Sequence, residues 1–198
     1  RSVSAFLLSR SSDLLALGSD GVIGIFEPVA RGAYRCVDHN VLDARASYTV
    51  ESVLAEIAAL PEPERIEAEW DEEAAYAEFR AEFLARQAQC GELAWCPADW
   101  SLIPQALWYA RFGYESALTA LALHPDRFRK LIRVAAARGR QQAVLHARGI
   151  VEGYHPRAIL TGEDLCSQKG PMVSPDYLRR EYFGLLEWAL EPMVEAGA

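Results

Sequence analysis

The sequence predicts an α/β fold of the (β/α)8 TIM-barrel type, present as an incomplete barrel with high helix content. Short runs of apolar and β-branched residues alternate with longer segments of helical periodicity, a pattern typical of β–α units with a parallel sheet. A complete barrel of this type usually takes about 250 residues. The 198 residues therefore predict a single domain, residues 1–198, that forms part of a larger barrel.

The N-terminal half begins with a strand and continues with two helices. Residues 21–26 (GVIGIF) are a β-rich run, and residues 27–48 predict mostly loop because they contain proline, glycine and a polar DHN sequence. Apolar side chains at helical spacing predict a helix over residues 49–60. Residues 61–70 read as a linker, and a capping aspartate begins a second helix over residues 71–89.

The central part of the chain adds a second strand and a long helix. Residues 91–96 (GELAWC) predict a strand, and the aromatic-rich residues 100–112 predict partial helix. A helix over residues 114–123 ends at a His-Pro pair, and another follows over residues 126–148, with Gly139 as its expected weak point.

The third predicted strand, residues 157–162, leads directly into polar residues. A helix in two parts, loosened near its glycine and its proline, covers residues 175–195. Polar groups that follow a strand are the usual place for chemistry in α/β proteins, because the strand positions them rigidly.

Composition limits the partners and the compartment. The net charge is −8 and the pI is about 5.1, which argue against nucleic acid or an anionic membrane as the main partner. No apolar run approaches the roughly 20 residues that span a bilayer, and the N-terminus lacks a signal-peptide pattern. Cys36, Cys90, Cys96 and Cys166 have no metal-binding spacing and predict reduced thiols of a cytoplasmic protein, with a Cys90–Cys96 disulfide as the minor alternative.

The first candidate site follows the third strand. Glu163 and Asp164 are adjacent, so their side chains point to opposite faces and one of them is expected to reach the barrel mouth as an acid or base. Ser167, Gln168 and Lys169 are candidates for lining a pocket. Helix capping or loop bracing is the alternative for these polar residues.

The second candidate site follows the second strand. Trp95, Cys96, Asp99 and Trp100 are predicted to bind substrate, because two indoles beside a carboxylate suit a flat, partly polar ligand. Ordinary packing beneath a loop is the alternative. Cys96 is a weak nucleophile candidate, since no histidine stands near it in the sequence.

Histidines and charge runs give weaker signals. His39 and His155 are placed where they could reach a site, whereas His124 at a helix break is expected to be structural. Residues 51–80 carry ten acids and two bases, and residues 127–148 carry seven bases. Two solvated helical faces are the favoured interpretation, and a basic surface that docks a partner or steers a polycarboxylate is the alternative.

The segment at residues 158–175, AILTGEDLCSQKGPMVSP, has the pattern D-x-x-S-Q-x-G-P-x-x-S-P. It resembles the uroporphyrinogen decarboxylase superfamily, in the form found in its corrinoid-linked methyltransferase branch. Two further blocks are similar to that family, residues 39–64, which end in an acidic Pro-x-Pro segment, and residues 92–132, with G-Y-E and H-P-D helix starts.

The resemblance implies a (β/α)8 barrel that transfers a methyl group between a corrinoid and a small acceptor, with a corrinoid protein as a partner. The family motif favours Asp164 as the residue that binds a substrate or the pyrrole N–H groups of a tetrapyrrole. The methyltransferase branch holds zinc through a His-x-Cys pair and a distant Cys in later strands. No His-x-Cys occurs here, so zinc would be bound by residues outside this chain, and no residue here is assigned to a metal.

Two other functions remain open. Uroporphyrinogen decarboxylation is a lyase reaction of tetrapyrrole biosynthesis that needs no metal or cofactor, but the Arg-rich early segment of that enzyme is not evident. The other is a catalytically incomplete binding or assembly module. Half a barrel exposes sheet edges and apolar interior, which require the missing half, a partner or a second copy of the chain.

Overall fold

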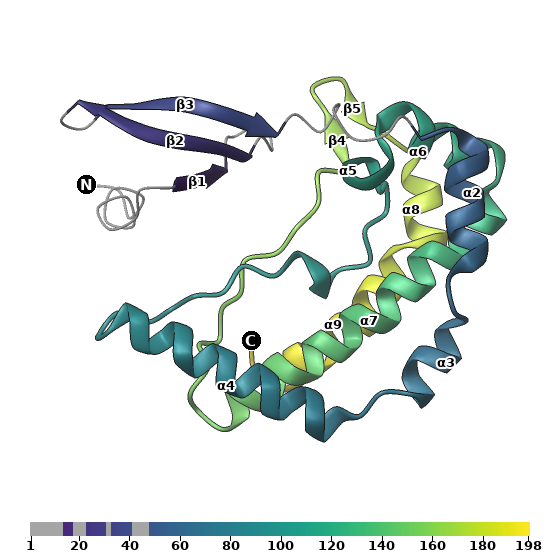
Figure 1. Ribbon diagram of the computed structural model, residues 1–198. Coiled ribbons are helices and arrows are strands. Elements are labelled where there is room, and N and C mark those ends of the chain that lie inside the picture. The colour runs from purple at the N-terminus through teal and green to yellow at the C-terminus, as the bar shows by residue number, and fades with distance from the viewer. Residues whose placement is uncertain (1–13, 18–22, 31–32, 41–47) are drawn as a thin grey trace.

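The computed structural model describes residues 14–17, 23–30, 33–40 and 48–198 (Figure 1). From residue 48 onward most of the chain is helical, which confirms the high helix content expected from the sequence. The helices are α2 (Val50–Ala59), α3 (Pro63–Ala68), α4 (Glu72–Cys90), the 3-10 turn η2 (Trp100–Leu102), α5 (Tyr109–Phe112), α6 (Tyr114–Leu123), α7 (Pro125–Val151), α8 (Pro175–Glu181) and α9 (Phe183–Glu195).

The named strands form two antiparallel sheets. The first has the order β1-β2-β3, and the second is a short hairpin of β4 and β5. The strands are β1 (Leu14–Leu17), β2 (Ile23–Ala30), β3 (Ala33–Asn40), β4 (Cys166–Ser167) and β5 (Gly170–Pro171). Residues 27–48 were expected to be loop with an extended piece, and the extended part is confirmed but covers most of the described residues there, because β3 pairs with β2 from Ile23↔Asn40 to Ala30↔Ala33.

Local capping explains where the early helices begin and end. Thr49 and Ser52 form a capping box at the start of α2, in which each side chain accepts a hydrogen bond from the other residue's backbone N–H, at 3.2 and 2.9 Å. Asp71 accepts from the Ala74 N–H at 3.0 Å and caps α4 as predicted. Gly91, with a φ of 63°, ends that helix. The predicted linker at residues 61–70 contains α3, which begins with Pro63 at its first turn.

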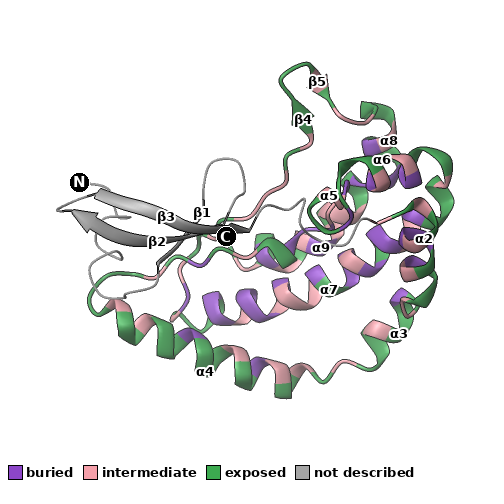
Figure 2. Cartoon of the chain, turned by 45° about the horizontal axis from the view of Figure 1, so that its top comes forward, coloured by how far each residue is buried: buried purple, intermediate pink, exposed green. Residues whose placement is uncertain are grey.

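Helix α7 is the central element of the fold and lies side by side with α9 (Figure 1). Figure 2 shows buried residues along the length of α7, while α4 is largely exposed on its outer side. The main core cluster joins α2, α6, α7 and α8 through Val53, Leu121, Phe128 and Leu178. A second cluster joins η2 to α7 and α9.

Gly139 does not weaken α7, in contrast to the sequence prediction. The helix is continuous from Pro125 to Val151. A Cβ atom at Gly139 would lie 2.7 Å from the carbonyl oxygen of Leu102, so the glycine allows η2 to approach the helix backbone closely. A tertiary contact, rather than a helix break, accounts for this residue.

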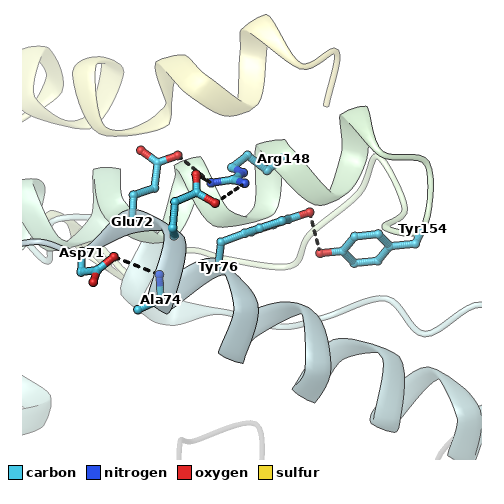
Figure 3. Close-up of polar contacts among 7 residues, drawn as sticks. Asp71, Glu72, Ala74, Tyr76, Arg148 and Tyr154 are labelled. Carbon is cyan, nitrogen blue, oxygen red and sulfur yellow. Dashed lines mark hydrogen bonds and ion pairs between the residues drawn. The ribbon is translucent and has the colours of Figure 1, made fainter.

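Arg148 on α7 forms ion pairs with two residues of α4 (Figure 3). Its guanidinium donates to Glu72 at 3.0 Å and to Glu73 at 2.8 Å, and lies 3.8 Å from the centre of the Tyr76 ring. The hydroxyl of Tyr154 donates to that of Tyr76 at 3.2 Å. These contacts set the position of α4, which supplies one wall of the cleft described below.

The acidic and basic runs of the sequence pair with each other. Besides Arg148, Lys130 lies 2.7 Å from Glu62 and Arg133 lies 2.9 Å from Glu64. The acidic side chains at α3 and α4 therefore pair with the basic face of α7, while Glu62, Glu64 and Glu73 stay 69%, 71% and 81% exposed, as the interpretation of solvated faces expects.

The second and third predicted strands, residues 91–96 and 157–162, do not form regular β-strands. Residues 91–96 form a turn and irregular backbone, and among the described residues parallel pairing is limited to a single bridge between Ala98 and Leu160. In this bridge the Asp99 N–H donates to the Leu160 carbonyl at 2.9 Å, and the Leu160 N–H donates to the Pro97 carbonyl at 3.0 Å. Pro97 has no N–H of its own, which prevents the ladder from extending through that residue.

Within the described part of the chain, none of the helices is both long enough and apolar enough to cross a membrane.

Candidate functional site

The bridge between Ala98 and Leu160 brings the two predicted site segments together. Asp99 and Trp100 follow one bridged residue, and Glu163 and Asp164 follow the other by a few positions. A Cβ atom at Gly162 would lie 3.9 Å from the Trp100 ring, so this ring lies close to the backbone of the second segment. Because the bridge is parallel, both segments leave it in the same direction.

Glu163 is turned inward and braces a loop. Its carboxylate accepts hydrogen bonds from the backbone N–H groups of Ala106 at 2.7 Å and Leu107 at 2.9 Å. Burial raises the pKa of Glu163, although these two hydrogen bonds and one from Tyr182 act in the opposite direction. These contacts hold the loop at Ala106 and Leu107, so Glu163 has the loop-bracing role that was the alternative interpretation for this residue.

Asp164 is exposed, whereas Glu163 is half-buried. Burial, with smaller contributions from the charges of Tyr114, Asp164 and Glu163, raises the pKa of Tyr109 to about 12. Trp108 follows Ala106 and Leu107, the two residues that Glu163 binds, and its φ of 54° is in the left-handed region. A large residue in that region costs about 1–3 kcal/mol, and the bonds to Glu163 help to hold the loop in this conformation.

Ser167, Gln168 and Lys169 lie in the β4–β5 hairpin. The Ser167 hydroxyl donates to the Gly170 carbonyl at 3.2 Å and accepts from the Lys169 N–H at 3.1 Å, so it braces the turn. Gln168 and Lys169 are exposed. Figures 1 and 2 both place this hairpin near α5 and α6, on the far side of the molecule from α4, so these residues do not join the cleft at α4.

Trp95 lies in a cleft of about 230 Å³ between α4 and the segment at residues 95–99. Its ring packs against Phe83 with centroids 4.8 Å apart, and the backbone N–H of Trp95 donates to the Gln87 side-chain oxygen at 2.8 Å. The cleft is lined by Phe79, Glu82, Phe83, Arg86, Trp95, Pro97, Ala98, Asp99, Gln142 and His146. Trp100 is 48% exposed and lies beside Gly162 instead, so the two tryptophans do not share one surface.

A chain of hydrogen bonds runs inward from the cleft. Asp99 Oδ2 lies 3.1 Å from Nε2 of His146, and Nδ1 of His146 lies 2.8 Å from Nε2 of His155. Nδ1 of His155 lies 2.6 Å from the Pro156 carbonyl oxygen. The imidazoles are 2% and 5% exposed, respectively, whereas Asp99 is half-buried and faces the cleft. The other oxygen of Asp99 accepts from the backbone N–H and hydroxyl of Ser101 at 2.8 and 2.6 Å.

The pKa values of this chain follow from burial and hydrogen bonding. Burial opposes the ionised form of Asp99, but the hydrogen bonds from His146 and Ser101 outweigh it and hold the pKa of the carboxyl below its usual range. Burial lowers the pKa of His155, and the charge of His146 acts in the same direction against the hydrogen bond to Pro156.

The cysteines and the remaining histidines contribute little to either cluster. Cys90, Cys96 and Cys166 are free thiols, and Cys96 donates to the Ala158 carbonyl at 3.3 Å. Cys36 and His39 lie on β3, whose side chains the structure does not describe. Among the described residues, no group of three or more His, Cys, Asp or Glu side chains is arranged to hold a metal ion.

His146 was missed by the sequence reasoning. It lies in the long helix α7, among the buried residues Ala143, Leu145, Ala147 and Ile150. A signal was present, because a titratable residue on an otherwise apolar helix face requires a polar partner. The identity of that partner depends on the tertiary fold.

No protein-family model, curated protein or solved structure significantly matches this chain.

Proposed function

We propose that this chain forms part of a cytoplasmic (β/α)8-barrel enzyme of the kind that the 158–175 motif resembles, acting in methyl transfer between a corrinoid and a small acceptor. The observation that supports it is the parallel bridge between Ala98 and Leu160. Two extended segments joined in parallel through the intervening helices are the basic unit of such a barrel, and its active site lies beyond the carboxyl ends of the strands. Asp99, Trp100 and Asp164 all lie beyond that bridge.

Under this proposal, the carboxylates of Glu163 and Asp164 have different roles. Glu163 holds the backbone of the loop at residues 104–108. The exposed Asp164 and the half-exposed Trp100 offer a carboxylate and an indole face to a flat ligand with polar edges. A corrinoid presented by a partner protein is the ligand proposed for this surface.

Zinc does not fit the residues described here, and no step of the proposal depends on it. The described side chains lack a ligand set for a metal ion, so a zinc site would have to come from elsewhere in the proposed barrel. What this chain offers instead is a binding surface and the acid–base groups near it.

The test is calorimetric titration of the natural protein in its full extent with hydroxocobalamin and, separately, with uroporphyrinogen. We expect hydroxocobalamin to bind and the Asp164→Asn and Trp100→Ala variants to bind it about tenfold more weakly, equivalent to about 1.4 kcal/mol. Asp176→Asn is the matched control, because that carboxylate is exposed on α8 and pairs with Arg179 at 2.7 Å.

Each alternative predicts a different result. If uroporphyrinogen is bound and turned over and hydroxocobalamin is not bound, the result would support decarboxylation as the function and refute methyl transfer. Binding of neither compound would refute both reactions and favour the binding module, for which the oligomeric state would be the next measurement.

A further inference from the structure

The hydrogen-bond chain from Asp99 to Pro156 fixes the number of protons that it contains. A carbonyl oxygen can only accept, so Nδ1 of His155 must donate to Pro156. If His155 is neutral, its Nε2 is then an acceptor, and Nδ1 of His146 must donate to it. A neutral His146 would consequently present a lone pair on Nε2 to the Asp99 carboxylate, and neither atom would have a hydrogen to share.

One additional proton removes this conflict. It can lie on Nε2 of His146, giving an imidazolium between two acceptors. It can also lie on Asp99, or on His155 with the His146 tautomer reversed, and in each arrangement all three hydrogen bonds are satisfied. These are three tautomers of a single protonation state. The burial of the histidines makes an unsatisfied contact costly, so the additional proton is held firmly.

We propose that Asp99, His146 and His155 form a proton relay that holds one additional proton and exchanges it with a ligand in the cleft through Asp99. This proposal deepens the proposed function, because methyl transfer to an acceptor and decarboxylation both require a proton to be moved. Asp99 is the acid–base group that touches the ligand, and the two histidines are positioning residues behind it.

The proton transfer balances without any further reactant. The Nε2–H bond of His146 breaks as an O–H bond forms on Oδ2 of Asp99, which leaves both imidazoles neutral. Asp99 then gives this proton to a basic atom of the ligand. The relay afterwards has two acceptors facing each other across the 3.1 Å contact, which favours the uptake of one proton from solvent or from the next ligand.

The surroundings leave this charge balance undisturbed. From α4, Glu82 and Arg86 line the same cleft but pair with each other at 2.6 Å, and Gln142 on α7 is neutral. Phe79 packs edge-on against His146 with centroids 4.8 Å apart, and Phe83 packs against His155 at 4.5 Å. The nearby Tyr154 hydroxyl donates to Tyr76 rather than to the relay. The hydrogen bonds from His146 and Ser101 lower the pKa of Asp99, and burial lowers the pKa of His155, so neither of these two groups favours holding the additional proton.

The test uses the Asp99→Asn variant and needs no ligand, so its outcome is independent of corrinoid or porphyrinogen binding. An asparagine NH₂ group can donate to Nε2 of His146, which then satisfies the chain with two neutral imidazoles. The proposal therefore predicts that the fold survives while the additional proton is lost. Asp126→Asn is the control, since that exposed carboxylate pairs with Arg129 at 3.3 Å, away from the cleft.

The measurement is NMR of the ring nitrogens in ¹⁵N-histidine protein, which has only four histidines to assign. At a pH of about 8, where an ordinary histidine with a pKa of about 6.5 is neutral, we expect about one imidazolium per chain in the wild type and in Asp126→Asn, and none in Asp99→Asn. Exchange of the ring N–H hydrogens with water should also slow at least about tenfold in Asp99→Asn, because their route to the cleft is lost. Two neutral imidazoles in the wild type, or unchanged exchange in the variant, would overturn the relay.

Discussion

Replacing Gly139 with alanine should destabilise the protein, although the same change in an ordinary helix is favourable. The added Cβ atom would lie 2.7 Å from the Leu102 carbonyl oxygen and 3.1 Å from the Ser101 carbonyl oxygen. Both neighbours are backbone, so η2 must move away from α7. Overpacking of this kind costs about 1–3 kcal/mol, and sometimes more when backbone moves. The gain in helix propensity is about 1 kcal/mol.

The difference is a net loss of up to about 2 kcal/mol in the free energy of unfolding. For a chain of this size, such a loss lowers Tm by up to about 8 °C. Thermal and urea unfolding, followed by circular dichroism, measure both quantities. Gly184→Ala is the matched control in α9, where the new Cβ would have nothing within 4 Å, and this variant should be as stable as the wild type or slightly more stable. A Gly139→Ala variant that is as stable as Gly184→Ala would refute the close approach of η2 to α7.

Three further predictions concern the cleft wall, a buried carboxylate and a helix cap. Phe83→Ala should cost about 3–5 kcal/mol in urea unfolding, because the ring is buried against Trp95 and His155, and a cost below about 1 kcal/mol would contradict that packing. Burial raises the pKa of Glu163, so its folded pKa exceeds the unfolded value of about 4.3. The wild type should therefore lose stability relative to Glu163→Gln as the pH rises from about 4.3 through the folded pKa. Melting both proteins across this pH range checks the sign, and a constant difference would show that Glu163 titrates normally. Thr49→Ala should lower the free energy of unfolding by about 1 kcal/mol, because it removes the cap of α2. Thr119→Ala is the control, because this half-buried threonine lies inside α6 and caps no helix.

Helix boundaries were predictable because their causes are local in the sequence. Asp71 caps α4 as expected, the helix expected to open at Thr49 begins directly after it, and His124–Pro125 separates α6 from α7. The expected strands at residues 91–96 and 157–162 were less predictable, since a strand forms only when a neighbour pairs with it. The structure limits that pairing to one bridge, at Ala98 and Leu160.

Part of the candidate site was predictable from residues placed next to the expected strands. Asp99 and His155 were named in this way and lie in the hydrogen-bond chain, whereas His146 lies in a helix with no motif around it. The role of Gly139 and the pairing of Glu62 with Lys130 also depend on contacts between residues far apart in the chain. Periodicity identifies a buried face, but it does not say which side chain lies opposite.

The central position of α7 has a consequence for synthesis on the ribosome. Residues 48–123 leave the ribosome before α7, and the buried side chains of α2 and α6 pack in a cluster that α7 and α8 complete. Until residues 125–151 have emerged, α2 and α6 can pack only against each other, and the apolar surface that contacts α7 stays uncovered. The first half of the described chain should therefore depend on chaperones or remain uncollapsed during translation, and folding should begin when α7 becomes available.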